Sequence, residues 1–198
     1  MEPVRVISGT AVPLRASDVD TDQIIPSDWL KKVERTGFGD GLFESWRESS
    51  DFVLNQGRYD GASILVAGAN FGTGSSREHA VWALMDYGFR AVVSVRFADI
   101  FRNNAGKNGL VAVEVDAATA DALLDAVEAD PSLEVVVDVE GRRISAPAAD
   151  IDAGFSLDDS VQYRLLNGLD DIGLTLAHAG TIETFEAGRP EWLPRTTG

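Results

Sequence analysis

Three short apolar runs alternate with helix-like segments in the middle of this chain. They occupy residues 63–67, 91–95 and 110–115, and glycines bound the first of them. Apolar runs of this length are typical of strands that are buried on both faces, as in parallel sheets. The segments between them, residues 75–87 and 98–108, have the length and pattern of helices. This alternation predicts an α/β fold with a mainly parallel core sheet.

Other segments predict strands and helices around this core. Residues 4–14 predict one or two strands with a turn at Ser8 and Gly9, and two more strands are expected at residues 133–139 and 143–146. Asp116 is placed to cap a helix that ends near residue 130, whose apolar residues fall on one face: Ala120, Leu123, Leu124 and Val127. Two further helices are expected at residues 158–167 and 170–179.

Polar and glycine-rich stretches predict loops, but none divides the chain. Residues 17–22 are mostly polar and include three aspartates, and residues 36–41 contain three glycines, so both are expected to be loops. Residues 29–33 are expected to begin a helix. No internal repeat or low-complexity linker is present, and 198 residues of 44% hydrophobic content can bury one substantial core. We expect a single domain over residues 1–198.

Charge and residue counts exclude several kinds of site. The net charge of -15 repels phosphate backbones, so nucleic-acid binding is not expected. Neither a signal peptide nor an apolar run of about 20 residues is visible, so we expect a cytoplasmic protein without a membrane segment. The chain has no cysteine, and its two histidines stand in no zinc spacing. Any iron–sulfur cluster or zinc ion would therefore belong to a partner.

The stretch GANFGTGSSREHA, residues 68–80, follows the first apolar run and has the composition of an anion site. A strand, a glycine loop and a helix start bring free backbone N–H groups together with the positive end of the helix dipole. The glycine spacing does not match the dinucleotide fingerprint, and no Gly-Lys-Ser/Thr sequence follows. The expected anion is therefore a carboxylate rather than a pyrophosphate.

Arg77 is expected in the first helical turn, where a cation opposes the helix dipole. Its planar guanidinium suits bidentate binding of a substrate carboxylate, although an ion pair with Glu78 or another acid fits equally well. Ser75 and Ser76 stand where helix-capping residues stand. Ser75 also lies beside amide donors and Arg77, an environment that stabilises an alkoxide and allows a serine to act as a base. His79 is expected to be a packed core residue.

Four ordered motifs together resemble the aconitase superfamily. The segment from Asn70 to Ala80 resembles the signature of its swivelling domain, and residues 18–26, 97–110 and 167–176 agree in order and spacing. Over nearly its whole length the chain is similar to bacterial isopropylmalate dehydratase small subunits. Its departures from the commonest family pattern are Thr73, Val81 and parts of residues 102–107, and they bear on the exact substrate rather than on the superfamily.

This resemblance implies a three-layer β/β/α swivelling domain of aconitase type and a hydro-lyase of leucine biosynthesis. The reaction interconverts 2- and 3-isopropylmalate through an unsaturated diacid. A separate large subunit would carry a [4Fe-4S] cluster, and this chain would close over the cluster and the small dicarboxylate substrate. The resemblance assigns the catalytic base to Ser75 and carboxylate binding to Arg77, with Gly74 and Ser76 beside them.

The resemblance also places residues 30–37, here called the substrate loop, against the side chain of the substrate. Leu30 and Val33 are its apolar residues and Arg35 is its only arginine, so it offers contacts for an isopropyl group and for an extra carboxylate. Two alternatives stay open. A homoaconitase or another alkylmalate or citraconate dehydratase shares the motifs and differs in this loop. A non-catalytic carboxylate-binding module would use the anion site without a cluster-bearing partner.

Overall fold

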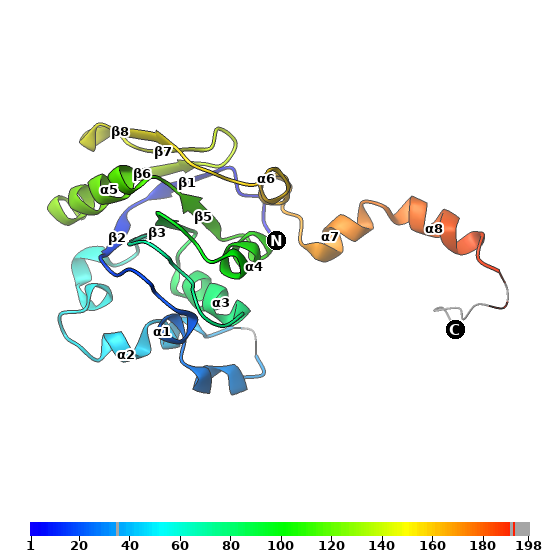
Figure 1. Cartoon of the computed structure of the whole chain (residues 1–198), viewed down its shortest axis with the longest axis horizontal. Helices are drawn as coiled ribbons and strands as arrows, with labels where there is room; N and C mark the ends of the chain where they lie inside the picture. The colour runs from blue at the N-terminus through cyan, green and yellow to red at the C-terminus, as the bar shows by residue number, and fades with distance from the viewer. Residues whose placement is uncertain (35, 191, 193–198) are drawn as a thin grey trace.

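The computed structural model describes residues 1–34, 36–190 and 192, which contain two four-stranded sheets (Figure 1). The parallel sheet has the order β2 (Ala11–Leu14), β3 (Ile64–Ala67), β4 (Ala91–Ser94) and β5 (Val111–Glu114). The antiparallel sheet has the order β1 (Val6–Gly9), β6 (Val135–Asp138), β7 (Arg143–Ala146) and β8 (Ile151–Gly154). The three buried runs are thus strands of one parallel sheet, as predicted.

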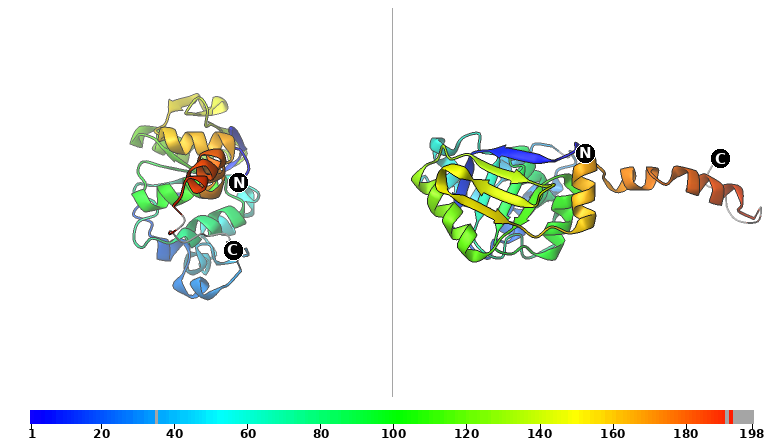
Figure 2. Two further views of the ribbon diagram at one scale, coloured as in Figure 1. Left: turned by 90° about the vertical axis from the view of Figure 1, so that its right-hand side faces the viewer. Right: turned by 90° about the horizontal axis from the view of Figure 1, so that it is seen from above.

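Helices and the second sheet cover the two faces of the parallel sheet (Figures 1 and 2). Helices α3 (Glu78–Tyr87) and α4 (Asp99–Asn108) lie on one side, and the antiparallel sheet lies on the other. Helix α5 (Ala117–Ala129) packs against β2 and β3 and also contacts β8. These layers confirm the expected three-layer β/β/α arrangement with a parallel core sheet.

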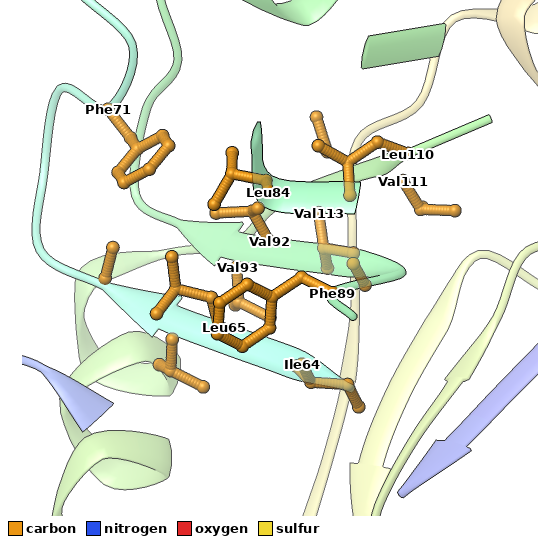
Figure 3. Close-up of a cluster of buried hydrophobic side chains, with 14 of the residues drawn as sticks. Ile64, Leu65, Phe71, Leu84, Phe89, Val92, Val93, Leu110, Val111 and Val113 are labelled. Atoms are coloured by element: carbon orange, nitrogen blue, oxygen red, sulfur yellow. The ribbon is translucent and has the colours of Figure 1, made fainter. Parts of the chain in front are cut away.

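The core forms where the sequence pattern places it. Every residue of β2, β3 and β4 is buried, because an apolar run without polar alternation has no solvent face to present. Figure 3 shows Leu65, Val92 and Val93 packed with Leu84 of α3 and with Phe89. In α5 the Asp116 carboxylate accepts the Thr119 N–H at 2.8 Å, and the predicted apolar face is buried: Ala120, Leu123, Leu124 and Val127.

The segment between β2 and β3 contains more regular structure than its sequence predicts. Helix α1 (Thr21–Ile24) begins inside the expected loop because Asp20 and Gln23 form a capping box. The expected helix start at residues 29–33 is a 3₁₀ turn, Ser27–Lys31. The glycine-rich stretch contains a 3₁₀ turn, Gly39–Gly41, in which Gly39 and Gly41 are buried. The remaining short elements are α2 (Glu44–Arg47), Val53–Asn55 and Gly57–Tyr59.

The glycines at 39 and 41 are needed for close packing rather than for a flexible loop. A side chain at Gly41 would lie 2.4 Å from the Trp29 ring, and one at Gly39 would lie 2.8 Å from the backbone nitrogen of Tyr87. The expectation of a flexible loop at residues 36–41 is therefore wrong for this part of it, because the backbone itself packs against a ring and a helix end.

The C-terminal third contains one strand and one helix that the sequence does not predict. Strand β8 follows a 3₁₀ turn, Pro147–Ala149, and extends the antiparallel sheet beyond β7. Helix α6 (Asp159–Asn167) agrees with prediction, whereas the helix expected at residues 170–179 is shorter, α7 (Asp171–Leu176), and is followed by α8 (Ala179–Ala187). Helices α7 and α8 extend away from the sheets (Figures 1 and 2). Within the described residues, no helix has the length and apolar character needed to cross a membrane.

Candidate active site

The loop of residues 68–77, which we call the anion loop, joins β3 to α3 and is held by the segment that enters α1. The Gly72 N–H donates to the Val19 carbonyl at 2.8 Å, and the Thr21 N–H donates to the Thr73 carbonyl at 2.9 Å. The Thr21 hydroxyl donates to the Ser75 carbonyl at 3.0 Å. Two of the motifs that are far apart in sequence therefore form one continuous surface.

Two glycines determine the backbone conformation of the anion loop. Gly72 has a φ of +76°, and a side chain there would lie 2.3 Å from the Phe101 ring. Gly74 has a φ of +87°, although a side chain there would meet its nearest atom only at 3.4 Å. The left-handed region is costly for residues with a Cβ atom. Gly72 is thus required by both conformation and packing, and Gly74 by conformation.

Helix α3 begins at Glu78 and not at Ser75 or Ser76, which corrects the expected position of three residues. Arg77 is the N-cap residue with extended backbone (φ −105°, ψ 106°), so it does not lie in the first helical turn. Its N–H donates to the Ser75 carbonyl at 2.8 Å, a tight turn that keeps these residues out of the helix. No side chain caps α3, so neither serine acts as a cap.

Ser75 and Ser76 are exposed, and their hydroxyls have no hydrogen-bond partner among the described residues. The backbone N–H groups of Gly74, Ser75 and Ser76 also lack an acceptor in this part of the chain. Free amides next to an uncapped helix start favour a negatively charged ligand. The free donors available to the predicted anion site therefore come mainly from the loop rather than from the helix.

Arg77 forms an ion pair with Asp22 of α1. The Arg77 side chain is only 16% exposed, whereas the Asp22 side chain is 59% exposed. Glu78, the neighbouring acid considered from sequence, accepts instead from the Asn108 side chain at 2.8 Å. A guanidinium has five N–H donors, so the pair with Asp22 leaves donors for a second carboxylate.

Asp22 is the site residue that the sequence does not reveal, because residues 17–22 predict only a loop. The signal is present as Asp20 followed three residues later by Gln23, a capping box that starts a helix. This helix places Asp22 in its first turn and turns the carboxylate toward Arg77.

His79 is packed, as predicted, within an aromatic cluster. Its ring centroid lies 5.3 Å from that of Phe38 and 4.7 Å from that of Trp82. Burial lowers the pKa of His79 below its ordinary value, which favours the neutral imidazole. The cluster connects α3 to the end of the substrate loop.

The two apolar residues of the substrate loop differ in exposure. Leu30 is half-buried in the 3₁₀ turn, and the Val33 side chain is 92% exposed. Arg35, the third predicted contact, lies outside the described residues. After the loop, Phe38 is fully buried and its N–H donates to the Asp86 carboxylate at 2.9 Å. The structure thus connects the loop to the anion loop through Phe38 and His79.

This chain does not have the ligands for an iron–sulfur cluster. No cysteine occurs in its 198 residues. Across residues 1–34, 36–190 and 192, no three histidine, aspartate or glutamate side chains are grouped as metal ligands. The free backbone N–H groups and the Arg77 guanidinium of the anion loop are donors only, which fit a carboxylate and not a metal ion.

Comparison with known proteins defines first the class and then the family. Residues 1–118 match the family model described as the aconitase C-terminal domain, so the fold and the anion loop are those of an aconitase-type domain. Residues 171–198 match the model for the C-terminal domain of the 3-isopropylmalate dehydratase small subunit. The chain belongs to the family of 3-isopropylmalate dehydratase small subunits.

Relatives of nearly full length support this assignment. The chain is 61% identical to the 3-isopropylmalate dehydratase small subunit of Frankia casuarinae, with 99% of this chain and 100% of the relative covered. It is 58% identical to that of Rubrobacter xylanophilus, with 98% and 99% covered. A crystal structure of 3-isopropylmalate dehydratase from Methanocaldococcus jannaschii has a TM-score of 0.67 at 25% identity, and the match covers 91% of this chain and 99% of that one.

Proposed function

We propose that this chain is the small subunit of a 3-isopropylmalate dehydratase that interconverts 2- and 3-isopropylmalate through an unsaturated diacid. Likeness to small subunits over 99% of the chain supports the reaction class. The observation that carries the site assignment is the exposed Ser75 hydroxyl, which has no partner among the described residues and lies between free amides and Arg77. The proposal places the enzyme in the cytoplasm, in leucine biosynthesis.

Ser75 acts in this proposal as the base that removes a proton from the carbon next to a carboxylate. A serine hydroxyl is far too weakly acidic to do so in water, so its alkoxide needs nearby positive charge and hydrogen-bond donors. The N–H groups of Gly74 to Ser76 supply donors that need no rearrangement during the reaction. Arg77 supplies the charge and holds a substrate carboxylate, while Asp22 keeps its guanidinium oriented.

The large subunit is the partner in this proposal, and it holds the [4Fe-4S] cluster because this chain has no cysteine to ligate one. When bound, such a cluster supplies a Lewis acid for the departing hydroxyl. The contribution of this chain is confined to positioning the substrate, binding its carboxylate and moving the proton at Ser75.

Substrate choice is assigned to the substrate loop. Leu30 and Val33 offer apolar contact to an isopropyl group, and Arg35 offers a cation to polar substituents or to a carboxylate. A pocket that gains or loses one small apolar group discriminates by about 10- to 200-fold, which suits a choice between alkyl side chains. The names of the relatives favour the isopropyl substrate over the homocitrate-type alternatives.

The test is reconstitution with a large subunit under anaerobic conditions. The Frankia casuarinae partner is suitable because its small subunit is 61% identical to this chain. Formation of the unsaturated diacid from 2-isopropylmalate is followed by absorbance, and each protein alone serves as the control. Absorbance that requires both chains supports the proposal. If the complex converts homocitrate or another alkylmalate but not 2-isopropylmalate, the substrate assignment changes to that compound. Diacid binding without any turnover would favour the non-catalytic binding module.

A further inference from the structure

Lys32 joins the two ends of the substrate loop. Its ammonium donates a hydrogen bond to the Gly37 carbonyl at 3.2 Å. The same nitrogen lies 5.7 Å from the centroid of the Trp29 ring and 5.5 Å from that of the Phe38 ring. A cation at these distances from two aromatic rings is attracted to both. Lys32 therefore contacts Trp29, which precedes the loop, Gly37 at its end, and Phe38, which follows it.

The two aromatic rings that contact Lys32 are themselves fixed. The Trp29 indole N–H donates to the Glu44 carboxylate at 3.0 Å, and its ring packs on the backbone of Gly41. Phe38 is fully buried and is held through its N–H by Asp86. The ammonium of Lys32 thus contacts two rings that are held in place, since neither ring can move without breaking a hydrogen bond or opening the core.

Gly37 is suited to this contact by its lack of a side chain. Its φ is +79°, and a Cβ atom there would lie 2.5 Å from the Lys32 ammonium nitrogen. The close approach of ammonium and backbone therefore depends on a glycine at this position. A side chain at this position would be strained by the positive φ and would displace the end of the Lys32 side chain from the carbonyl.

One of the aromatic residues that contact Lys32 is also connected to the anion loop. The Phe38 ring contacts the His79 ring, with 5.3 Å between centroids, and His79 lies two residues after Arg77 on α3. The position of the substrate loop is consequently set relative to the same helix whose N-cap residue is Arg77.

We propose that Lys32 is a positioning residue that acts as a latch between the two ends of the substrate loop and fixes where Leu30 and Val33 meet the substrate side chain. This inference rests on the proposed function of the loop. Lys32 touches no reacting atom in the proposal. Loss of the latch leaves the anion loop intact and lets the loop residues move, so that contact with the alkyl group of the substrate weakens.

The test compares three variants in the reconstituted complex with 2-isopropylmalate. Lys32→Met keeps a long apolar side chain but loses the donor and the charge, and it is expected to raise KM about 5- to 10-fold with kcat within about twofold. Lys32→Arg keeps a cationic donor and is expected to restore most of the affinity. Lys107→Met, which removes the same charge from an exposed ion pair with Asp171 on the surface of α4, is the control and should change neither constant. Equal KM values for Lys32→Met and Lys107→Met would overturn the proposal.

A second readout does not depend on turnover. In the free small subunit, amide hydrogen exchange of residues 33–36 is expected to be at least several-fold faster in Lys32→Met than in the parent chain, with exchange in β3 and β4 unchanged. Unchanged exchange in residues 33–36 would show that Lys32 is no latch, whatever the reaction. If the parent complex shows no turnover while the exchange result holds, the proposed function fails and the latch remains.

Discussion

Arg77 is paired with Asp22 of α1, and in the proposed function this pairing prepares the residue to bind a substrate carboxylate. The side chain is largely buried, so the guanidinium has lost much of its hydration before a ligand arrives. The Asp22 carboxylate is largely exposed to water, so it neutralises the Arg77 charge only in part. Under the proposed function, a substrate carboxylate would meet a cation whose direction is already fixed, which lowers the entropy lost on binding.

Arg77→Lys is expected to raise KM for 2-isopropylmalate by about 10- to 100-fold, because one ammonium cannot bond Asp22 and a substrate carboxylate in the bidentate manner. The melting temperature should change little, since an ion pair with an exposed partner adds little stability. Steady-state kinetics of the reconstituted complex measures the first quantity, and thermal unfolding of the free small subunit measures the second. An unchanged KM would assign Arg77 a purely structural role.

At this scale the sequence predicts the chemistry of the site better than its geometry. Ser75, the free amides and Arg77 follow from a short contiguous segment, and their roles in the site stay predictions. Asp22 and the N-cap position of Arg77 depend on contacts between segments 55 residues apart, which local patterns do not encode. Arg35 lies outside the described residues, so its assignment rests on sequence alone.

The anion loop is an element whose shape depends on two glycines with different constraints. Gly72→Ala is expected to destabilise the fold by about 3 kcal/mol or more, because it combines left-handed strain with a clash against the Phe101 ring. Gly74→Ala meets only the conformational strain, about 1–2 kcal/mol. Chemical denaturation of the two variants in parallel gives both values. Equal losses would contradict the packing constraint assigned to Gly72.

Helix α5 allows a pH test of its N-cap. Hydrogen bonds from Thr119 lower the pKa of the Asp116 carboxyl, so its stabilising contribution is present above the unfolded pKa and is lost as pH falls through the lower folded value. Asp116→Asn should have the same unfolding free energy as the parent at pH 7, because asparagine caps as well as aspartate, and should lose less stability as the pH falls below about 4. If the unfolding free energies of Asp116→Asn and the parent chain changed with pH in the same way, titration of the Asp116 cap would not contribute to stability.

The elements that the sequence predicts correctly are those with a strong local signal. Strands β3, β4 and β5 are continuous apolar runs, and α5 has both a cap and an apolar face. Strand β8 has no such signal, because its residues are only half-buried or exposed and its place depends on pairing with β7. Helix starts and ends shift for the same reason, since contacts with other segments decide them.

The whole molecule consists of a layered body and a C-terminal extension that contributes little to its core. Large apolar side chains of the extension are exposed, among them Ile172, Leu176 and Phe185. Deletion of residues 177–198 should therefore leave the melting temperature of the body within about 2 °C of the parent value, because little buried apolar area is lost. Differential scanning calorimetry measures it. A fall of about 10 °C or more would show that α8 is packed against the body in solution.

Ser75 as the base of a two-subunit hydro-lyase is best tested by the turnover number of Ser75→Ala in the reconstituted complex. We expect kcat to fall by about 10²- to 10⁴-fold, the usual contribution of a positioned base. Because the Ser75 side chain is exposed and has no partner among the described residues, the fold and co-elution with the large subunit should be unchanged. A variant that associates normally and keeps the parent kcat would contradict the assignment of Ser75 as the base.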